Sequence, residues 1–138
     1  RLNCGFAVVA KRRVSATTVE SSHLVGDVKG RDCVICDDLT STAGTLCAAA
    51  ELLKKEGAKK VYAVVSHCLL TEAAQEKLKN SAIEELVTTN SVPHTDLEGG
   101  RVRTLCIAPL LARAIKRIHD GESVSSLFRV NPEAMLFL

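Results

Sequence analysis

Residues 32 to 53 read DCVICDDLTSTAGTLCAAAELL, an apolar run that ends in two carboxylates and continues into small hydroxyl residues and a glycine. The run DCVIC is short and rich in β-branched residues, which is typical of a buried strand. The residues after it have the apolar spacing of a helix, with Gly57 as the stop signal. The apolar face of this helix consists of Leu46, Ala49, Ala50 and Leu53.

Short apolar runs of the same kind recur along the chain, and helical patterns lie between several of them. Alternation of strands and helices predicts a parallel, doubly wound α/β sheet. Polar residues 11–22 and 91–100 read as loops. We expect further strands at 6–10, 23–28, 61–65, 85–89 and 103–108, and helices at 45–60, 71–80 and 109–121, the last with Leu110, Leu111, Ala114, Ile115 and Ile118 on one face.

Composition limits the classes of partner. The chain has 138 residues, of which 46% are hydrophobic, as expected for one compact domain. Lys plus Arg number 18 against 16 for Asp plus Glu, and aromatic residues make up 3%, so neither nucleic acid nor an anionic membrane is expected as a partner. The six cysteines come without a secretory pattern or an apolar run of membrane length, so we expect reduced thiols and a cytoplasmic protein.

The acid pair and the segment after it indicate a binding site. In a doubly wound sheet, ligands bind beyond the carboxyl ends of the strands, where Asp37 and Asp38 are expected. The helix N-terminus can bind phosphate, with hydroxyl donors from Thr42 and Thr45, while Gly44 can take a backbone conformation closed to other residues. The carboxylates suit sugar hydroxyls or Mg²⁺. The pattern therefore indicates a phosphorylated sugar. The alternative is an acid pair that ends a strand and a Ser or Thr that caps a helix.

The chain resembles a known family at several motifs. DDLTSTAGT resembles the ribose-phosphate binding motif of the phosphoribosyltransferase fold. The motifs KRR, LVGDVKGR, ICDD, EGAKKVYAVVSH, VTTNSVP and ARAIKRIHDGESVSSLF follow in the order and spacing of the C-terminal domain of ribose-phosphate pyrophosphokinases, up to about Phe128. This resemblance implies transfer of pyrophosphate from ATP to the 1-hydroxyl of ribose 5-phosphate, with Mg²⁺ and with inorganic phosphate as activator. The products would be phosphoribosyl pyrophosphate, for nucleotide biosynthesis, and AMP.

The resemblance also implies roles for individual residues. Asp37 and Asp38 would hold the ribose hydroxyls and would also be the residues that bind Mg²⁺. Lys11 and Arg13 match the catalytic loop of the family. From chemistry alone, Phe128 would be a core residue, whereas the resemblance gives it a regulatory role. The 5-phosphate would be bound by Ser41, Thr42, Ala43, Gly44 and Thr45, and a regulatory phosphate or ADP by Ser123, Ser125 and Phe128.

Two departures from the family keep other functions open. Ser41 stands where the family carries an aspartate, and CLLTEAA after residues 66–67 replaces a different loop. A non-catalytic regulatory subunit is therefore one alternative, and a phosphoribosyltransferase is another.

The resemblance further predicts that residues 1–138 form a C-terminal domain truncated at its N-terminus, which lacks the first strand of its sheet. Such a sheet exposes backbone and apolar surface, so we expect self-association, as a dimer to a hexamer, through an N-terminal domain or the exposed sheet.

Cysteine and histidine give no metal site in the sequence. Cys33 and Cys36 are an odd number of residues apart, so on a strand they point to opposite faces, and we expect both to be core residues. His67 ends a strand at the ligand edge, but no role is assigned to it or to the other histidines.

Overall fold

The computed structural model describes residues 4–12, 21–93 and 101–128. The chain divides into two compact units, Arg1–Thr104 and Leu105–Leu138. The first unit contains a four-stranded sheet, two helices and a hairpin, and the second contains one helix and a 3₁₀ turn.

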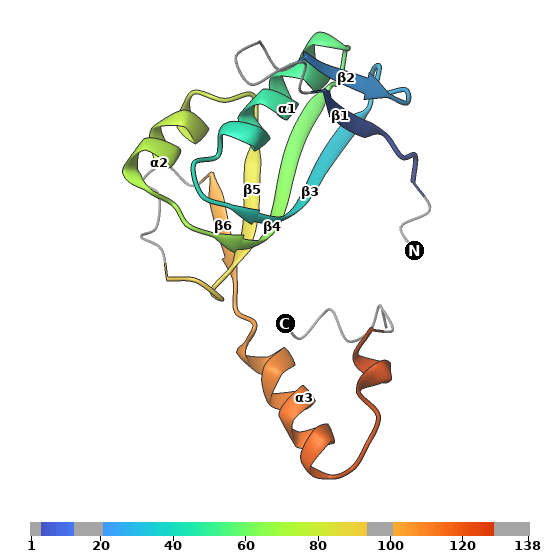
Figure 1. Cartoon of the computed structure of the whole chain (residues 1–138), viewed down its shortest axis with the longest axis vertical. Helices are drawn as coiled ribbons and strands as arrows, with labels where there is room; N and C mark the ends of the chain where they lie inside the picture. Colours follow the sequence, from blue (N-terminus) through green and yellow to red (C-terminus); the bar gives the residue numbers. More distant parts are fainter. Residues whose placement is uncertain (1–3, 13–20, 94–100, 129–138) are drawn as a thin grey trace. The chain divides into compact units, whose positions relative to one another are not determined.

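The sheet of the first unit has the strand order β3-β4-β5-β6. β3 and β4 pair in parallel, with Cys33 beside Val61, and β4 pairs in parallel with β5. Figure 1 shows β6 running in the same direction as β5. The predicted parallel α/β sheet is therefore confirmed. The strands are β3 (Asp32–Thr40), β4 (Lys60–Cys68), β5 (Glu85–Thr89) and β6 (Val102–Leu105).

Two helices, α1 (Gly44–Lys55) and α2 (Glu72–Lys79), cover one face of this sheet (Figure 1). α1 ends before Gly57, whose φ of 92° is readily available only to glycine. α2 begins at Thr71, whose hydroxyl accepts the Ala74 N–H at 3.3 Å. The predicted apolar face of α1 is confirmed, because its buried residues are Leu46, Ala49, Ala50 and Leu53.

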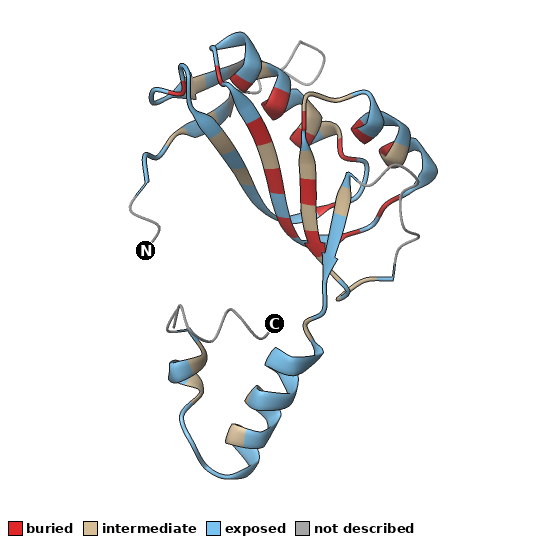
Figure 2. Ribbon diagram, turned by 180° about the vertical axis from the view of Figure 1, so that it is seen from behind, coloured by how far each residue is buried: buried red, intermediate tan, exposed pale blue. Residues whose placement is uncertain are grey.

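The opposite face of the sheet is open. Successive strand residues point to opposite faces, and Val61, Ala63 and Val65 of β4 are buried against the helices. Val64 of β4 is 40% exposed, and Val34, two residues before its β3 register partner Cys36, is 58% exposed. Figure 2 shows this face, and no described helix of the first unit lies over it. This face therefore exposes apolar side chains among the described residues.

The first two strands, β1 (Val8–Arg12) and β2 (Ser21–Val25), form an antiparallel hairpin apart from the main sheet. The expectation that these runs belong to the parallel sheet is wrong. The reason is the short connection: residues 13–20 are too few for the crossover of a dozen or more residues that parallel strands require. Residues 11–22 were expected to be loop throughout, but both ends of that segment are strands.

The second unit contains α3 (Ala108–His119) and η1 (Val124–Phe128). The predicted helix is confirmed, with Pro109 in its first turn. Among the described residues, however, its apolar face is not buried: Ile115 and Ile118 are 67% and 69% exposed. Phe128 is 73% exposed, so its expected place in a core is also wrong. In the described part of the chain, no helix has the length and apolar character needed to cross a membrane.

Candidate functional site

Asp37 and Asp38 lie on β3, at one edge of the described sheet. The sequence placed them just beyond the strand, but β3 continues to Thr40 because the chain still pairs with β4 there. Both carboxylates are exposed. The Asp37 carboxylate accepts the Asp38 N–H at 3.0 Å, which fixes its position next to the backbone. The pair therefore sits close to the carboxyl end of the strand, where ligands of parallel α/β sheets bind.

The turn from β3 into α1 differs from the prediction in its key residue. Ala43, not Gly44, has the left-handed backbone, with φ 55° and ψ 1°. Ala43 is the N-cap and is 1% exposed, so packing of its methyl group holds this unfavourable conformation in place. The Ala43 carbonyl accepts the first helical bond, from Cys47 N–H at 2.9 Å. The left-handed residue and the helix start form the kind of concave turn whose amides bind anions.

No side chain of the described residues caps α1 at Ala43. The alternative reading, in which a Ser or Thr caps this helix, is therefore wrong. Ser41, Thr42 and Thr45 are exposed around the turn. An uncapped helix start has backbone N–H groups directed outward, and its dipole favours an anion. The turn thus has the donors and the charge preference of a phosphate site.

A cluster of hydroxyl groups and one imidazole, which we call the β4–β5 network, lies at the carboxyl ends of β4 and β5. This is the same end of the sheet as the acid pair on β3. His67 Nδ1 lies 2.7 Å from Ser91 Oγ, and Ser91 Oγ lies 2.9 Å from Thr89 Oγ1. Both hydroxyls reach the Ser66 carbonyl. No role was predicted for Thr89 and Ser91, because they meet His67 only once β4 and β5 pair. The motif VTTNS, residues 87–91, is the local signal for them.

The residues predicted for the catalytic loop are only partly described. Lys11 lies on β1, where it is the register partner of Ser22 on β2. Arg13 lies outside the described residues. Lys11 is therefore the last residue but one of β1.

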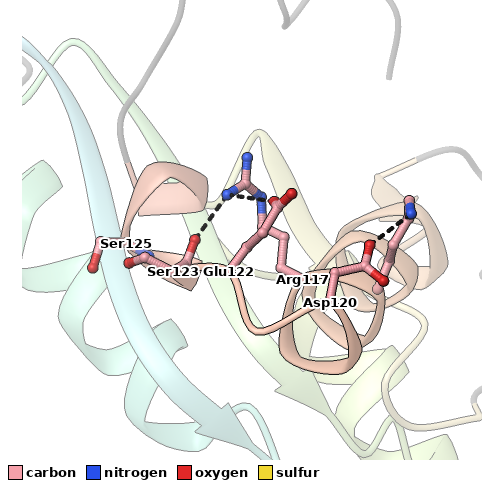
Figure 3. A network of polar contacts seen from close by, with 6 residues as sticks. Arg117, Asp120, Glu122, Ser123 and Ser125 are labelled. Carbon is pink, nitrogen blue, oxygen red and sulfur yellow. Dashed lines mark hydrogen bonds and ion pairs between the residues drawn. The ribbon is translucent and has the colours of Figure 1, made fainter.

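The residues predicted for the regulatory site lie in the second unit (Figure 3). Arg117 connects them to α3, because its guanidinium donates to the Ser123 carbonyl at 2.8 Å and pairs with Glu122 at 3.3 Å. The Ser125 N–H donates to Ser123 Oγ at 3.2 Å, and both serines are exposed. The tail therefore turns back beside the end of its own helix, with two exposed hydroxyls.

Cys33 and Cys36 both lie on β3 but differ in burial. Cys33 is half-buried and burial raises the pKa of its thiol, whereas Cys36 is exposed. The prediction that they point to opposite faces is consistent with this difference, but Cys36 is not a core residue, because it lies on the open face of the sheet. Within the described ranges, no three His, Cys, Asp or Glu side chains are grouped so that they could hold a metal ion.

The fold, together with the acid pair and the turn at the carboxyl end of β3, defines a phosphoribosyltransferase-like α/β domain. The chain belongs to the phosphoribosyl synthetase-associated domain family, whose model matches residues 8–129. It is 44% identical over 128 residues to a ribose-phosphate pyrophosphokinase of Aquifex aeolicus, covering 93% of this chain and 41% of that protein. It is 45% identical over 130 residues to the enzyme of the same name from Burkholderia pseudomallei, with the same coverage.

A solved structure agrees with these relatives. The phosphoribosylpyrophosphate synthetase of Mycobacterium smegmatis superposes with a TM-score of 0.69 and 36% sequence identity, over 73% of this chain and 34% of that one. The chain thus spans about two fifths of the length of the curated relatives it matches.

Proposed function

We propose that this chain is the ribose-phosphate-binding part of a ribose-phosphate diphosphokinase, an enzyme of nucleotide precursor synthesis. The observation that carries the proposal is the pairing of two exposed carboxylates on β3 with an uncapped helix start three residues after that strand. One end of a sugar phosphate needs acceptors for its hydroxyls, and the other needs donors for its phosphate. The relatives that are 44% and 45% identical to this chain are named ribose-phosphate pyrophosphokinase.

In this proposal, Asp37 and Asp38 accept hydrogen bonds from the ribose hydroxyls. Ser41 to Thr45 bind the 5-phosphate through backbone amides and hydroxyls, with Ala43 and Gly44 bringing the backbone close to it. The sugar is thereby held with its 1-hydroxyl free to react. That oxygen forms a bond to the β-phosphorus of ATP, the bond from this phosphorus to the bridging oxygen of AMP breaks, and the hydroxyl proton is released. Positioning of the two substrates supplies much of the rate enhancement for such transfers.

Charge on the transferred group requires cations. Lys11, on β1, and Arg13 are proposed to supply them. Asp37 and Asp38 offer hard, exposed oxygens, and Mg²⁺ commonly takes one or two carboxylates together with waters and substrate oxygens, so the donor set fits that ion. Mg²⁺ bound there would neutralise charge on the phosphoryl oxygens. The carboxylates themselves orient the sugar.

Assembly and regulation belong to the same proposal. We place the protein in the cytoplasm, as a homo-oligomer that covers apolar surface such as Val34 and Val64 on the open sheet face. Ser123, Ser125 and Phe128 are proposed to bind the regulatory phosphate or ADP, for which the exposed hydroxyls and amides of the tail provide donors. This chain alone is expected to bind the sugar phosphate without completing the reaction.

A regulatory, non-catalytic subunit is the second candidate, and Ser41 favours it. Ser41 is exposed in the turn that follows the acid pair, where it offers a hydroxyl in place of a carboxylate. The lost negative charge would weaken contact with the sugar or Mg²⁺. If this candidate is correct, Ser41→Asp should raise activity in a longer protein that includes the remaining length of the relatives.

The test is calorimetric titration of ribose 5-phosphate into the chain, with and without Mg²⁺. We expect saturable binding that Asp37→Ala abolishes. Asp32→Ala is the matched control, because it removes an exposed carboxylate at the other end of β3 and should bind as the wild type does. Absence of binding in a folded wild-type sample, or equal losses in both variants, would overturn the sugar-phosphate site.

A further inference from the structure

The β4–β5 network contains more contacts than its hydroxyl protons can serve. Thr89 Oγ1 lies 2.7 Å from the Ser66 carbonyl and 2.9 Å from Ser91 Oγ. Ser91 Oγ lies 3.0 Å from the Ser66 carbonyl and 2.7 Å from His67 Nδ1. Each hydroxyl carries a single proton, so two hydroxyls can donate two of these four bonds.

This count favours one tautomer of His67. If Ser91 donated to Nδ1, the contact between Ser91 and the Ser66 carbonyl would bring two lone pairs together without a proton. If Nδ1 carries the proton and donates to Ser91, then Ser91 can donate to the Ser66 carbonyl and Thr89 can donate to either acceptor. Three of the four contacts then become hydrogen bonds. In neutral His67, the free lone pair is therefore on Nε2.

The second ring nitrogen is available for a ligand. His67 is exposed and its contact with Ser91 is made through Nδ1, so Nε2 lies on the other side of the ring from this contact. The register of β3 and β4 pairs His67 with Leu39, the residue that follows Asp38. Neighbouring strands lie about 5 Å apart, so the backbone of His67 is beside the acid pair at the same end of the sheet.

We propose that His67 Nε2 accepts a hydrogen bond from a hydroxyl of the bound sugar phosphate. Ser91 and Thr89 are positioning residues that fix the ring and its tautomer. This inference rests on the proposed function, since it takes the ligand over Asp37 and Asp38 to be a phosphorylated sugar. It adds a third acceptor, from β4, to the two carboxylates from β3.

Two amide substitutions separate ligand contact from a structural role. The side-chain amide of His67→Asn can occupy the place of Nδ1 and keep the bond to Ser91, but it has nothing at Nε2. The longer side chain of His67→Gln can reach the place of Nε2 and gives up the bond to Ser91. The measurement is the Kd for ribose 5-phosphate by calorimetry, with intact folding checked by the fluorescence of Tyr62, the only tyrosine in the sequence.

We expect His67→Asn to weaken binding about three- to tenfold, the usual effect of one lost hydrogen bond, and His67→Gln to lose less. Ser91→Ala should give an intermediate loss, because the ring keeps Nε2 but is no longer held. The reverse order, with Asn tolerated and Gln not, or wild-type Kd in both variants, overturns the assignment. If Asp37→Ala abolishes binding while His67→Asn binds normally, the sugar site stands and only the role of His67 falls. If the wild type does not bind, both proposals fail.

Discussion

The left-handed Ala43 gives the sharpest test of the turn that begins α1. In this backbone region an L-residue pays about 1–2 kcal/mol. Ala43→Gly removes that cost but also removes a fully buried methyl group, about 0.8 kcal/mol, and makes the unfolded chain more flexible by roughly 0.5–1 kcal/mol. The terms nearly cancel, so we expect a change in the free energy of unfolding within about 1 kcal/mol.

Ala43→Val should be far worse. Its two extra methyl groups enter a site that is 1% exposed, and overpacking of this kind costs about 1–3 kcal/mol. A β-branched residue with φ 55° adds roughly 1 kcal/mol more. We therefore expect a loss of about 2–4 kcal/mol, together with loss of ribose 5-phosphate binding as the turn is displaced.

Gly44→Ala is the matched control. A Cβ at Gly44 would meet Thr42 Oγ1 at 3.7 Å, an ordinary van der Waals contact, and Gly44 does not have a positive φ. Its unfolding free energy should not fall. The assay is urea unfolding followed by tyrosine fluorescence, which reports only on the sheet, because Tyr62 lies on β4 and the sequence has no tryptophan. The reasoning is refuted if Ala43→Val is as stable as the wild type, or if Gly44→Ala lowers the free energy of unfolding by more than Ala43→Val does.

Three further predictions concern the core and the thiols. Leu46→Ala should lower the free energy of unfolding by about 3 kcal/mol in the same urea assay, because Leu46 is 1% exposed under α1. Leu69→Ala, at 44% exposed just after β4, should change it by less than about 0.5 kcal/mol. Iodoacetamide should alkylate Cys36 in the folded chain and spare Cys68, whose pKa burial raises above its ordinary value of 9.0; mass spectrometry of the labelled peptides decides this. The folded state holds the Cys68 proton more tightly than the unfolded chain does, so the free energy of unfolding should fall as pH rises above 9.0, and by less in Cys68→Ala.

Local patterns determined the elements that depend on near neighbours. The apolar face of α1, the stop at Gly57 and the start of α3 at Pro109 follow from spacing and from residue-specific backbone preferences, and all three agree with the structure. The order of strand, acid pair, turn and helix was also readable, and it located the candidate site at the end of β3.

Only the tertiary structure decided features that depend on residues distant in the sequence. The left-handed residue is Ala43 and not the glycine beside it, because the packing of the turn, including the buried Ala43 methyl group, fixes the backbone there. His67 meets Ser91 across 24 residues only because β4 and β5 pair. The exposed apolar face of α3 shows that a sequence pattern alone does not decide burial. Periodicity gives a helix its apolar stripe, and tertiary packing decides whether the stripe is buried.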